Sequence, residues 1–442
     1  MTRALVCVAL GLSTFAACGA PTAWHGLSPD HRRAFSVVDS DGRACMRLDD
    51  GETRCYDGVS LAGIVFSADS RSWAYPVQNG SGWMVVRDGR PGPVEDGTGE
   101  LVFSPGGDAL AYTALREGRW HVVVDGVAGE PYDSLLAGTL TFDPTGRRLA
   151  YAAFRGNWAV AVIDGIPGPP MDGTARLSFS EDGRHVAYVG RRGDRVALSL
   201  DGTLGPSHDA ITEYAFEPSG AGTAYAAADG ESWWVVAADQ RLGPYREVRD
   251  LAYRPSDGRL VFVARDREGE RVVAGGQSGP VFEAVDPPAF SALGTRWGYV
   301  AHDSVASLVV LDGRVIDSHA WAGDLTISPD GERWAYVVRT GDADVVVHDR
   351  GVDALDMVVY GTLQFVREGD AWACLAGDPD GRDLYVRVEG RTERRPFSWS
   401  ELAGVARRRS GSSVDGAEAL EALRAWVAAE SDMILGTGDT GR

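Results

Sequence analysis

The chain contains no lysine, and all 43 of its Lys+Arg residues are arginine. Schiff-base catalysis and a phosphate-binding P-loop both need a lysine amine, so both chemistries are excluded. The formal net charge is -20, and the 63 acidic residues are spread along the 442 positions. Nucleic acid is not an expected partner, because phosphate binding needs a concentrated basic surface. A cation, a basic peptide or a neutral ligand fits this charge better.

Sequence signatures of common catalytic sites are also missing. The chain has no Gly-x-Ser-x-Gly, no His-Glu-x-x-His, no Cys-x-x-Cys and no Gly-x-Gly-x-x-Gly after a strand pattern. Its eight histidines occupy no common place in the repeat described below, as a ring of metal ligands would. We therefore predict no catalytic residue, no metal site and no cofactor, apart from a possible cation discussed below.

Cysteine is scarce, with five residues in the chain. Cys45 and Cys55 flank a strand-turn-strand pattern with Asp50-Gly51 at the turn. A three-residue loop would set the two cysteines opposite each other, within reach of a disulfide, whereas a two-residue loop would point them to opposite faces. The pattern favours a disulfide between Cys45 and Cys55, with two buried thiols as the alternative.

One apolar run stands out, from Ala4 to Phe15, and it is too short to span a bilayer as a mature helix. It ends in Phe-Ala-Ala-Cys, which resembles the lipobox of bacterial lipoproteins. The resemblance implies a signal peptide over residues 1–17, lipidation of Cys18 and a tether over 18–26. Since Gly19 follows the cysteine, it also favours the outer membrane, facing the periplasm or the cell surface. An ordinary secretory signal cut near Ala20 is the alternative.

The chain is rich in one repeated phrase, seen as LVFSPGGDALAYT at 101–113 and again as LTISPDGERWAYV at 325–337. The spacing between neighbouring copies is 37 residues in most intervals. An aromatic or apolar anchor marks the first strand of each copy, at Phe66, Phe103, Phe142, Phe179, Phe216, Tyr253, Phe290, Ile327 and Phe365. Nine positions later stand Tyr75, Tyr112, Tyr151, Tyr188, Tyr225, Phe262, Tyr299, Tyr336 and Cys374. Cys374 takes the place of an aromatic residue, so we predict that it packs in the core.

A third strand in most copies ends in Asp-Gly, as at Asp88-Gly89 and Asp125-Gly126, and a short fourth segment follows. Asp-Gly between β-rich runs is a strong hairpin signal, because both residues tolerate the positive φ of the turn. Four short strands every 37 residues form a blade that buries both faces only when neighbours stack on it. The sequence therefore predicts an all-β protein, a β-propeller of four-stranded blades.

The repeats extend over residues 27–397, with about nine full copies and a degenerate one at the start. One large ring, two smaller propellers in tandem and a ring with a shared blade remain open. Residues 398–442 read as a polar linker followed by an amphipathic helix, since Leu420, Leu423, Val427 and Ile434 recur at helical spacing. We expect this helix to pack against the outer edge of the propeller, with contact to a partner as the alternative.

The phrase FSPDG…LAY…VVVDG resembles the propeller repeat of TolB and of related WD40-like bacterial proteins. The resemblance covers most of the chain and implies the fold. It also implies binding of peptides and membrane-protein partners, through surfaces that the motif does not encode. The N-terminal α/β domain of TolB has no counterpart here, because the strand pattern begins soon after the signal segment.

Candidate ligand-binding residues follow from the repeat. The innermost strand of each blade begins about three residues before its anchor, where residues of separate blades would meet at the channel mouth. Five of these positions carry charge: Glu100, Arg176, Glu213, Asp250 and Asp324. Converging carboxylates would hold a cation or a basic peptide end. Replacing Glu213 and Asp250 by alanine should then leave the fold intact and weaken such a ligand.

The leading functional hypothesis is a non-enzymatic, membrane-anchored propeller of the bacterial cell envelope. It would bind an envelope protein or peptide through its loop face and contact the membrane through the N-terminal lipid alone. One alternative is a propeller enzyme, such as a metal-assisted hydrolase or lyase at the channel mouth, because propeller active sites draw single residues from many blades. A purely structural envelope protein is the other.

Overall fold

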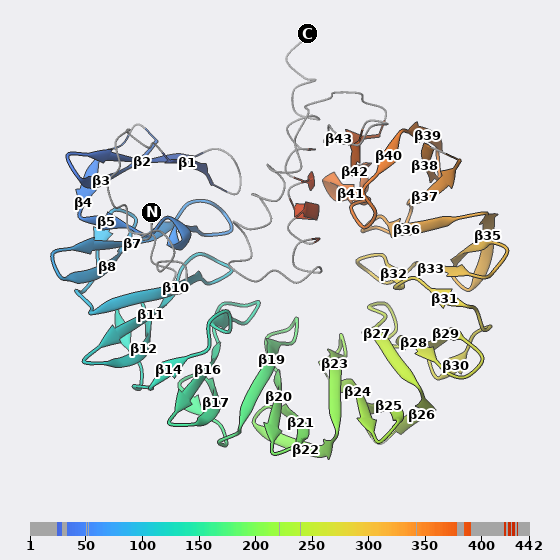
Figure 1. Ribbon diagram of the computed structural model, residues 1–442, viewed down its shortest axis with the longest axis horizontal. Helices are drawn as coiled ribbons and strands as arrows, with labels where there is room; N and C mark the ends of the chain where they lie inside the picture. Colours follow the sequence, from blue (N-terminus) through green and yellow to red (C-terminus); the bar gives the residue numbers. More distant parts are fainter. Residues whose placement is uncertain are drawn as a thin grey trace, which may run out of the picture. The chain divides into compact units, whose positions relative to one another are not determined.

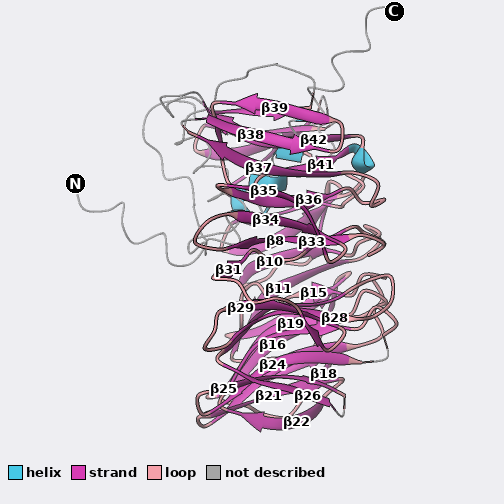
Figure 2. Ribbon diagram, turned by 90° about the vertical axis from the view of Figure 1, so that its right-hand side faces the viewer, coloured by secondary structure: helices cyan, strands magenta, loops and turns pink. Residues whose placement is uncertain are grey.

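The computed structural model describes residues 24–28, 33–49, 51, 53–220, 222–238, 240–341, 343–377 and 384–389, together with helical residues at 420, 423–425, 427–428 and 431. The predicted signal segment with Cys18 and most of the C-terminal linker lie outside these residues. The described chain is dominated by strands, with a few helical turns (Figure 2). It divides into two compact units, residues 1–211 and 212–442, and the division falls within strand β23.

The first unit forms successive antiparallel sheets in which strand order follows the chain (Figure 1). The first sheet contains β1 (Trp24–Leu27), β2 (Ala34–Ser40), β3 (Arg43–Leu48) and β4 (Arg54–Tyr56). The second contains β5 (Gly58–Val59), β6 (Val65–Phe66), β7 (Trp73–Asn79), β8 (Gly82–Arg87) and β9 (Arg90–Pro91), with the short 3-10 helix η1 (Leu61–Gly63) between β5 and β6. The third contains β10 (Gly97–Phe103), β11 (Leu110–Arg116), β12 (Arg119–Val124) and β13 (Val127–Ala128). The fourth contains β14 (Ser134–Leu135), β15 (Thr141–Phe142), β16 (Leu149–Arg155), β17 (Trp158–Ile163) and β18 (Ile166–Pro167), and the fifth contains β19 (Gly173–Phe179), β20 (Val186–Arg192), β21 (Arg195–Leu200) and β22 (Thr203–His208).

The second unit repeats this plan. The sixth sheet contains β23 (Ala210–Phe216), β24 (Thr223–Asp229), β25 (Ser232–Ala237) and β26 (Gln240–Tyr245), and the seventh contains β27 (Glu247–Tyr253), β28 (Leu260–Arg265), β29 (Glu270–Ala274) and β30 (Gln277–Ser278). The eighth contains β31 (Ala284–Val285), β32 (Ala289–Phe290), β33 (Trp297–His302), β34 (Ser307–Leu311) and β35 (Arg314–His319). The ninth contains β36 (Ala322–Ile327), β37 (Trp334–Thr340), β38 (Ala343–His348) and β39 (Gly351–Leu355). The tenth contains β40 (Met357–Val358), β41 (Gln364–Val366), β42 (Ala371–Gly377) and β43 (Leu384–Val388), with the 3-10 helix η2 (Arg367–Gly369) after β41.

This succession of antiparallel sheets, each with short connections and one sheet per repeat, confirms the predicted all-β propeller fold. The residues nine positions after each anchor are all buried, from Tyr188 at 0% exposure to Tyr225 at 7%. They contribute to clusters that fill the space between neighbouring sheets. Neighbouring sheets within a unit therefore cover each other's apolar faces, as the sequence argument requires.

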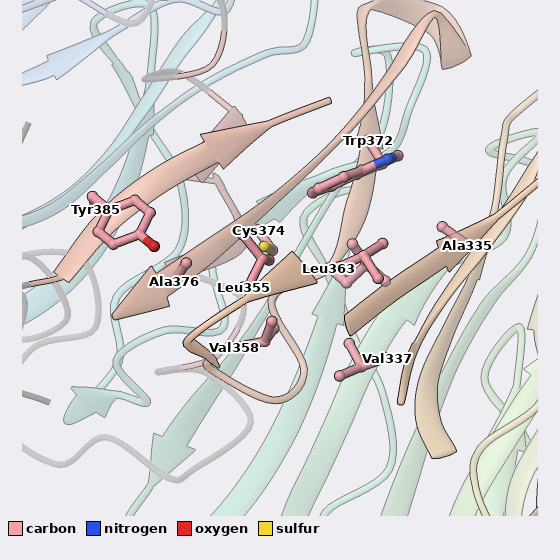
Figure 3. Close-up of a cluster of buried hydrophobic side chains, with 10 residues drawn as sticks. Ala335, Val337, Leu355, Val358, Leu363, Trp372, Cys374, Ala376 and Tyr385 are labelled. Carbon is pink, nitrogen blue, oxygen red and sulfur yellow. The ribbon is translucent and has the colours of Figure 1, made fainter. Parts of the chain in front are cut away.

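Cys374 is buried like the aromatic residues at the equivalent positions of the other repeats. It is fully buried on β42, and it lies in a cluster with Leu363, Trp372 and Val358 from the tenth sheet and Val337 from the ninth (Figure 3). Burial raises the pKa of its thiol, so the sulfur stays protonated and apolar. The prediction that Cys374 packs in the core is confirmed.

The Asp-Gly pairs form the hairpins between the third and fourth strands. Asp88 and Gly89 have φ values of 50° and 74°, so both adopt the left-handed conformation. The carboxylate of Asp88 accepts a hydrogen bond from the backbone N–H of Trp73 at 2.9 Å, which ties the turn to the second strand. Asp125 accepts the equivalent hydrogen bond from the N–H of Leu110 at 3.0 Å. These aspartates thus stabilise the hairpin by accepting a backbone hydrogen bond from the second strand.

The anchors are half-buried, with the exception of Ile327, and arginines lie over several of them. The guanidinium of Arg87 lies 5.5 Å from the ring centroid of Phe103 in the next sheet and donates to the carbonyl of Asp108. Arg333 does the same over Phe365, at 5.2 Å, and donates to the carbonyl of Asp370. Planar guanidinium groups that stack and donate together are well suited to join neighbouring sheets.

A disulfide joins Cys45 on β3 to Cys55 on β4, and the two residues are direct partners in the strand register. It links the last two strands of the first sheet. Exported compartments permit such a bond.

The helical residues near the C-terminus do not contact the outer edge expected from the sequence. Val427 is fully buried against Val366, Leu375 and Val386, on the face of the tenth sheet that points away from the ninth. Leu423 is packed against the same cluster. In the described part of the chain no later sheet covers this apolar face within the second unit, and the helix covers it instead.

Candidate functional site

Four of the five charged positions predicted at the strand starts lie at irregular points of the first strands. The register of paired residues shifts between Thr98 and Leu101, around Glu100, and the same shift occurs around Arg176, Asp250 and Asp324. Arg176, Asp250 and Asp324 have φ values of 55° to 56°. A β-bulge with a left-handed residue turns the side chain out of the regular alternation.

Three of the predicted carboxylates bind the backbone of the next sheet. Glu100 accepts from the N–H of Gly138 at 3.0 Å, and Glu213 accepts from the N–H groups of Asp250 at 3.2 Å and Leu251 at 2.8 Å. In the same way Asp324 accepts from Gly361 at 2.9 Å and Leu363 at 3.1 Å. The partners lie 37 to 39 residues further along the chain, one repeat away. We call Glu100, Glu213 and Asp324 the latch carboxylates.

Burial raises the pKa of two latch carboxylates. It does so for Glu100, although the N–H groups of Gly138 and Leu140 oppose the shift. Asp324 is more deeply buried, at 8% exposure, and its pKa is raised to about 6. The backbone N–H groups that it binds and the guanidinium of Arg424 lower this value, whereas the nearby Asp286 raises it. The raised pKa values of Glu100 and Asp324 thus follow from their burial where one sheet packs on the next.

Asp250 belongs to a different network. It forms an ion pair with Arg249, which also donates to the buried Glu270 at 2.7 Å and to the carbonyl of Val285 at 2.6 Å. Glu270 in turn accepts from the N–H of Val285 at 2.9 Å. This network joins the seventh sheet to the eighth.

The structure therefore brings Glu213 to the backbone of Asp250 but uses both residues to hold sheets together. Within the described residues, no group of three or more His, Cys, Asp or Glu side chains is arranged to hold a metal ion. Arg176 is exposed.

Sequence reasoning missed a polar network in the second unit. The hydroxyl of Tyr360 donates to Asp286 Oδ2 at 2.7 Å, across 74 positions of the chain, and His302 Nε2 lies 3.1 Å from Asp286 Oδ1. His302 Nδ1 lies 2.8 Å from the hydroxyl of Ser307. The hydrogen bond with Asp286 raises the pKa of His302, against the effect of burial. No spacing signal relates these residues, because only folding brings the eighth and tenth sheets to a common point.

Sequence reasoning also missed two grooves at the outer strands. The first, of about 610 Å³, lies in the first unit between β8, the segment Arg90–Pro93 and the third sheet, where Leu110 and Tyr112 line it. The second, of about 480 Å³, lies in the second unit between β34, β35 and Trp334 of β37. Both follow an Asp-Gly hairpin, and Leu110 and Trp334 both stand seven positions after an anchor. The grooves therefore occupy the same place in the repeat.

Exposed apolar side chains also lie on two outer strands of the first unit. Val127 on β13 is 73% exposed and Ile166 on β18 is 72% exposed. Each directly follows the Asp-Gly pair of its hairpin, so the two residues are equivalent in consecutive sheets. Exposed apolar groups at a repeated place are a common mark of contact surfaces.

No helix within the described residues has the length and apolar character needed to cross a membrane.

Fold and topology define the chain as a β-propeller protein. No family model matches it, and no curated protein sequence matches it either. Among solved structures it is similar to a eukaryotic initiation factor, at 12% identity and a TM-score of 0.43, over 76% of this chain and 95% of that one. It is also similar to the Dos1 propeller, at 12% identity and a TM-score of 0.31, over 65% and 91%. For the β-propeller domain of the Trilobed protease from Pyrococcus furiosus the identity is 9% and the TM-score 0.26, over 64% and 91%. At these values the likeness carries no argument about function.

Proposed function

We propose that the protein is a non-enzymatic, membrane-anchored β-propeller of the bacterial cell envelope that binds a protein or peptide partner. The observation that carries the proposal is the equivalent exposure of Val127 and Ile166 on consecutive outer strands. Leaving two large aliphatic groups in water is unfavourable by roughly 1.5–3 kcal/mol for each side chain that a partner would bury.

The outer strands of the first unit also offer backbone groups. β13 pairs with β12 on one side and β18 pairs with β17 on one side, so each ends its sheet among the described strands. The groove of about 610 Å³ lies one sheet earlier, with Pro91 and Pro93 on its wall. An extended peptide that adds to such an edge gains main-chain hydrogen bonds, while apolar side chains fill adjacent hollows.

The latch carboxylates support a contact at the outer strands over one at the strand starts. Their oxygens already accept backbone hydrogen bonds, as those of Glu213 do from Asp250 and Leu251. A ligand at that place would have to displace bonds between sheets. We therefore place the partner at the outer strands, and not at the loop face favoured by the sequence.

Placement in the envelope is supported by the lipobox resemblance at Cys18 and by the resemblance of the repeat to TolB, whose relatives act in that compartment. The disulfide between Cys45 and Cys55 agrees with export.

Binding of the partner and attachment to the membrane are tested separately, by co-purification and by fractionation. We expect a defined protein to co-purify in constant ratio with the wild-type chain and with the Val305→Asp control, since Val305 is 87% exposed in a hairpin loop. The Val127→Asp/Ile166→Asp double variant should lose it while keeping its melting temperature. Cys18→Ser should shift the chain from the membrane to the soluble fraction. Retention of the partner by the double variant would refute the binding site, and an unchanged fraction would refute the lipid anchor.

A further inference from the structure

The groove in the second unit differs from its counterpart in the first by having an indole ring on its wall, that of Trp334. Trp334 stacks on Tyr336, with ring centroids 5.6 Å apart and planes at 16°. Tyr336 is fully buried, so the indole of Trp334 rests on a fixed support. In the first groove the equivalent position is Leu110.

Tyr336 also fixes a carboxylate of the groove. Its hydroxyl donates to Asp317 Oδ2 at 2.6 Å, and His319 Nε2 lies 3.0 Å from the same oxygen. Burial acts to raise the pKa of Asp317, but the hydrogen bonds from Tyr336 and from the N–H of Ser318 outweigh it and hold this pKa below its usual range. Asp317 is thus an ionised acceptor at neutral pH, and its side chain keeps 43% of its surface exposed.

The remaining charges of the groove balance one another. Arg296 lies 3.5 Å from Asp312, and Arg314 lines the groove close to Asp317 in sequence. Two carboxylates and two guanidinium groups give the groove no net charge, so it does not select a cation or an anion. Ile316, 42% exposed, adds an apolar surface beside Trp334.

We propose that this groove binds a neutral oligosaccharide. A sugar ring has an apolar C–H face, which stacks on an aromatic ring, and hydroxyl groups around its edge, which both donate and accept. Trp334 and Ile316 match the face, the carboxylates of Asp312 and Asp317 accept from hydroxyls, and the guanidinium groups of Arg296 and Arg314 donate to them. A concave site with an apolar floor and a few fixed polar groups is typical of small-ligand recognition. The site is distinct from the outer strands of the first unit proposed above for a protein partner.

The test uses the full chain, purified after export, and four neutral tetrasaccharides: maltotetraose, cellotetraose, mannotetraose and N-acetylchitotetraose. Titration calorimetry and saturation-transfer NMR should detect binding of at least one, with a dissociation constant below about 1 mM. The Trp334→Leu variant, which installs the residue of the first groove, should weaken binding at least tenfold, and Asp317→Asn should weaken it several-fold. The Trp158→Leu control removes another indole, 50% exposed on β17 in the first unit, and should leave binding unchanged.

Melting curves of the four proteins show whether each variant is folded. If Trp334→Leu is unstable, the NMR contacts between the sugar protons and the indole of the wild-type chain decide the matter. The proposal is overturned if none of the four sugars binds, or if the affinity is the same in wild type, Trp334→Leu and Asp317→Asn.

Discussion

At the scale of single residues, the structure gives charged groups a mechanical role that their pattern in the sequence concealed. Glu100, Glu213 and Asp324 stand at the strand starts where a ligand site was expected, but their oxygens bind N–H groups one repeat further on. The sequence predicts the position of these residues, since it follows from the period of the repeat. For Glu100 and Asp324 the partners depend on the bulge geometry of the first strand, which no local spacing encodes.

Glu213→Ala tests this role. It leaves the N–H groups of Asp250 and Leu251 without their acceptor in a half-buried place, so we expect a loss of about 1–3 kcal/mol in the free energy of unfolding. This changes the sequence-based expectation that the substitution spares the fold. Glu213→Gln keeps one acceptor oxygen and should lose less. The control is Glu231→Gln at an exposed position, where urea unfolding should show a change within about 0.5 kcal/mol. Equal stability of Glu213→Ala and wild type would remove the latch interpretation.

Asp324 should make stability depend on pH. Its pKa of about 6 in the folded chain exceeds the ordinary value of 3.8, because burial disfavours the charged form. The folded state therefore binds the proton more tightly than the unfolded state, and this contribution is present below pH 4 and is lost as the pH rises through 6. A shift of this size corresponds to about 3 kcal/mol.

Asp324→Asn isolates that contribution. Relative to wild type, the variant should gain stability between pH 4 and pH 7.5, because the amide stays neutral throughout. Urea unfolding of both proteins at the two pH values measures the difference, in which the other titrating groups cancel. A stability difference that does not change with pH would mean that Asp324 ionises without cost.

At the scale of elements, helical residues near the C-terminus cover one face of the tenth sheet. The repeat predicts four strands and a following neighbour, but the tenth sheet has β43 as its last described strand and carries an apolar face that Val427 and Leu423 cover. Terminal repeats need such a cover, because they lack one neighbour. The helical spacing of Leu423 and Val427 was visible in the sequence, whereas the surface that they bury was not, since the outer edge and the open face present similar strands.

The Val427→Asp variant tests whether the helical residues stabilise the tenth sheet by covering its apolar face. A carboxylate at a fully buried position among Val366, Leu375 and Val386 should cost more than about 2 kcal/mol and expose the apolar face, which dye binding would report. Ala425→Asp on the exposed side of the same helical segment is the matched control. If both variants melt at the wild-type temperature, the helix does not stabilise the second unit.

At the scale of the whole molecule, the periodicity of the sequence predicts the fold but does not predict the grooves or the exposed apolar surfaces. Buried residues such as Tyr75 and Tyr336 recur at a fixed offset from their anchors because every sheet meets its neighbour in the same way. The Asp-Gly turns follow for the same reason. The grooves and the exposed side chains of Val127 and Ile166 depend on small differences between copies, such as Leu110 in place of Trp334, and a repeat alignment averages these away.

The latch carboxylates at the starts of the first strands hold neighbouring sheets together, and we propose that the outer strands of the first unit bind a partner. Site-specific photo-crosslinking in living cells tests this proposal directly, with the reactive residue placed at Val127, Ile166, Glu100 or Arg176. We predict a discrete crosslinked product from Val127 and Ile166 and none from Glu100 and Arg176. Products from the inner positions alone would contradict the account and return the binding site to the starts of the first strands.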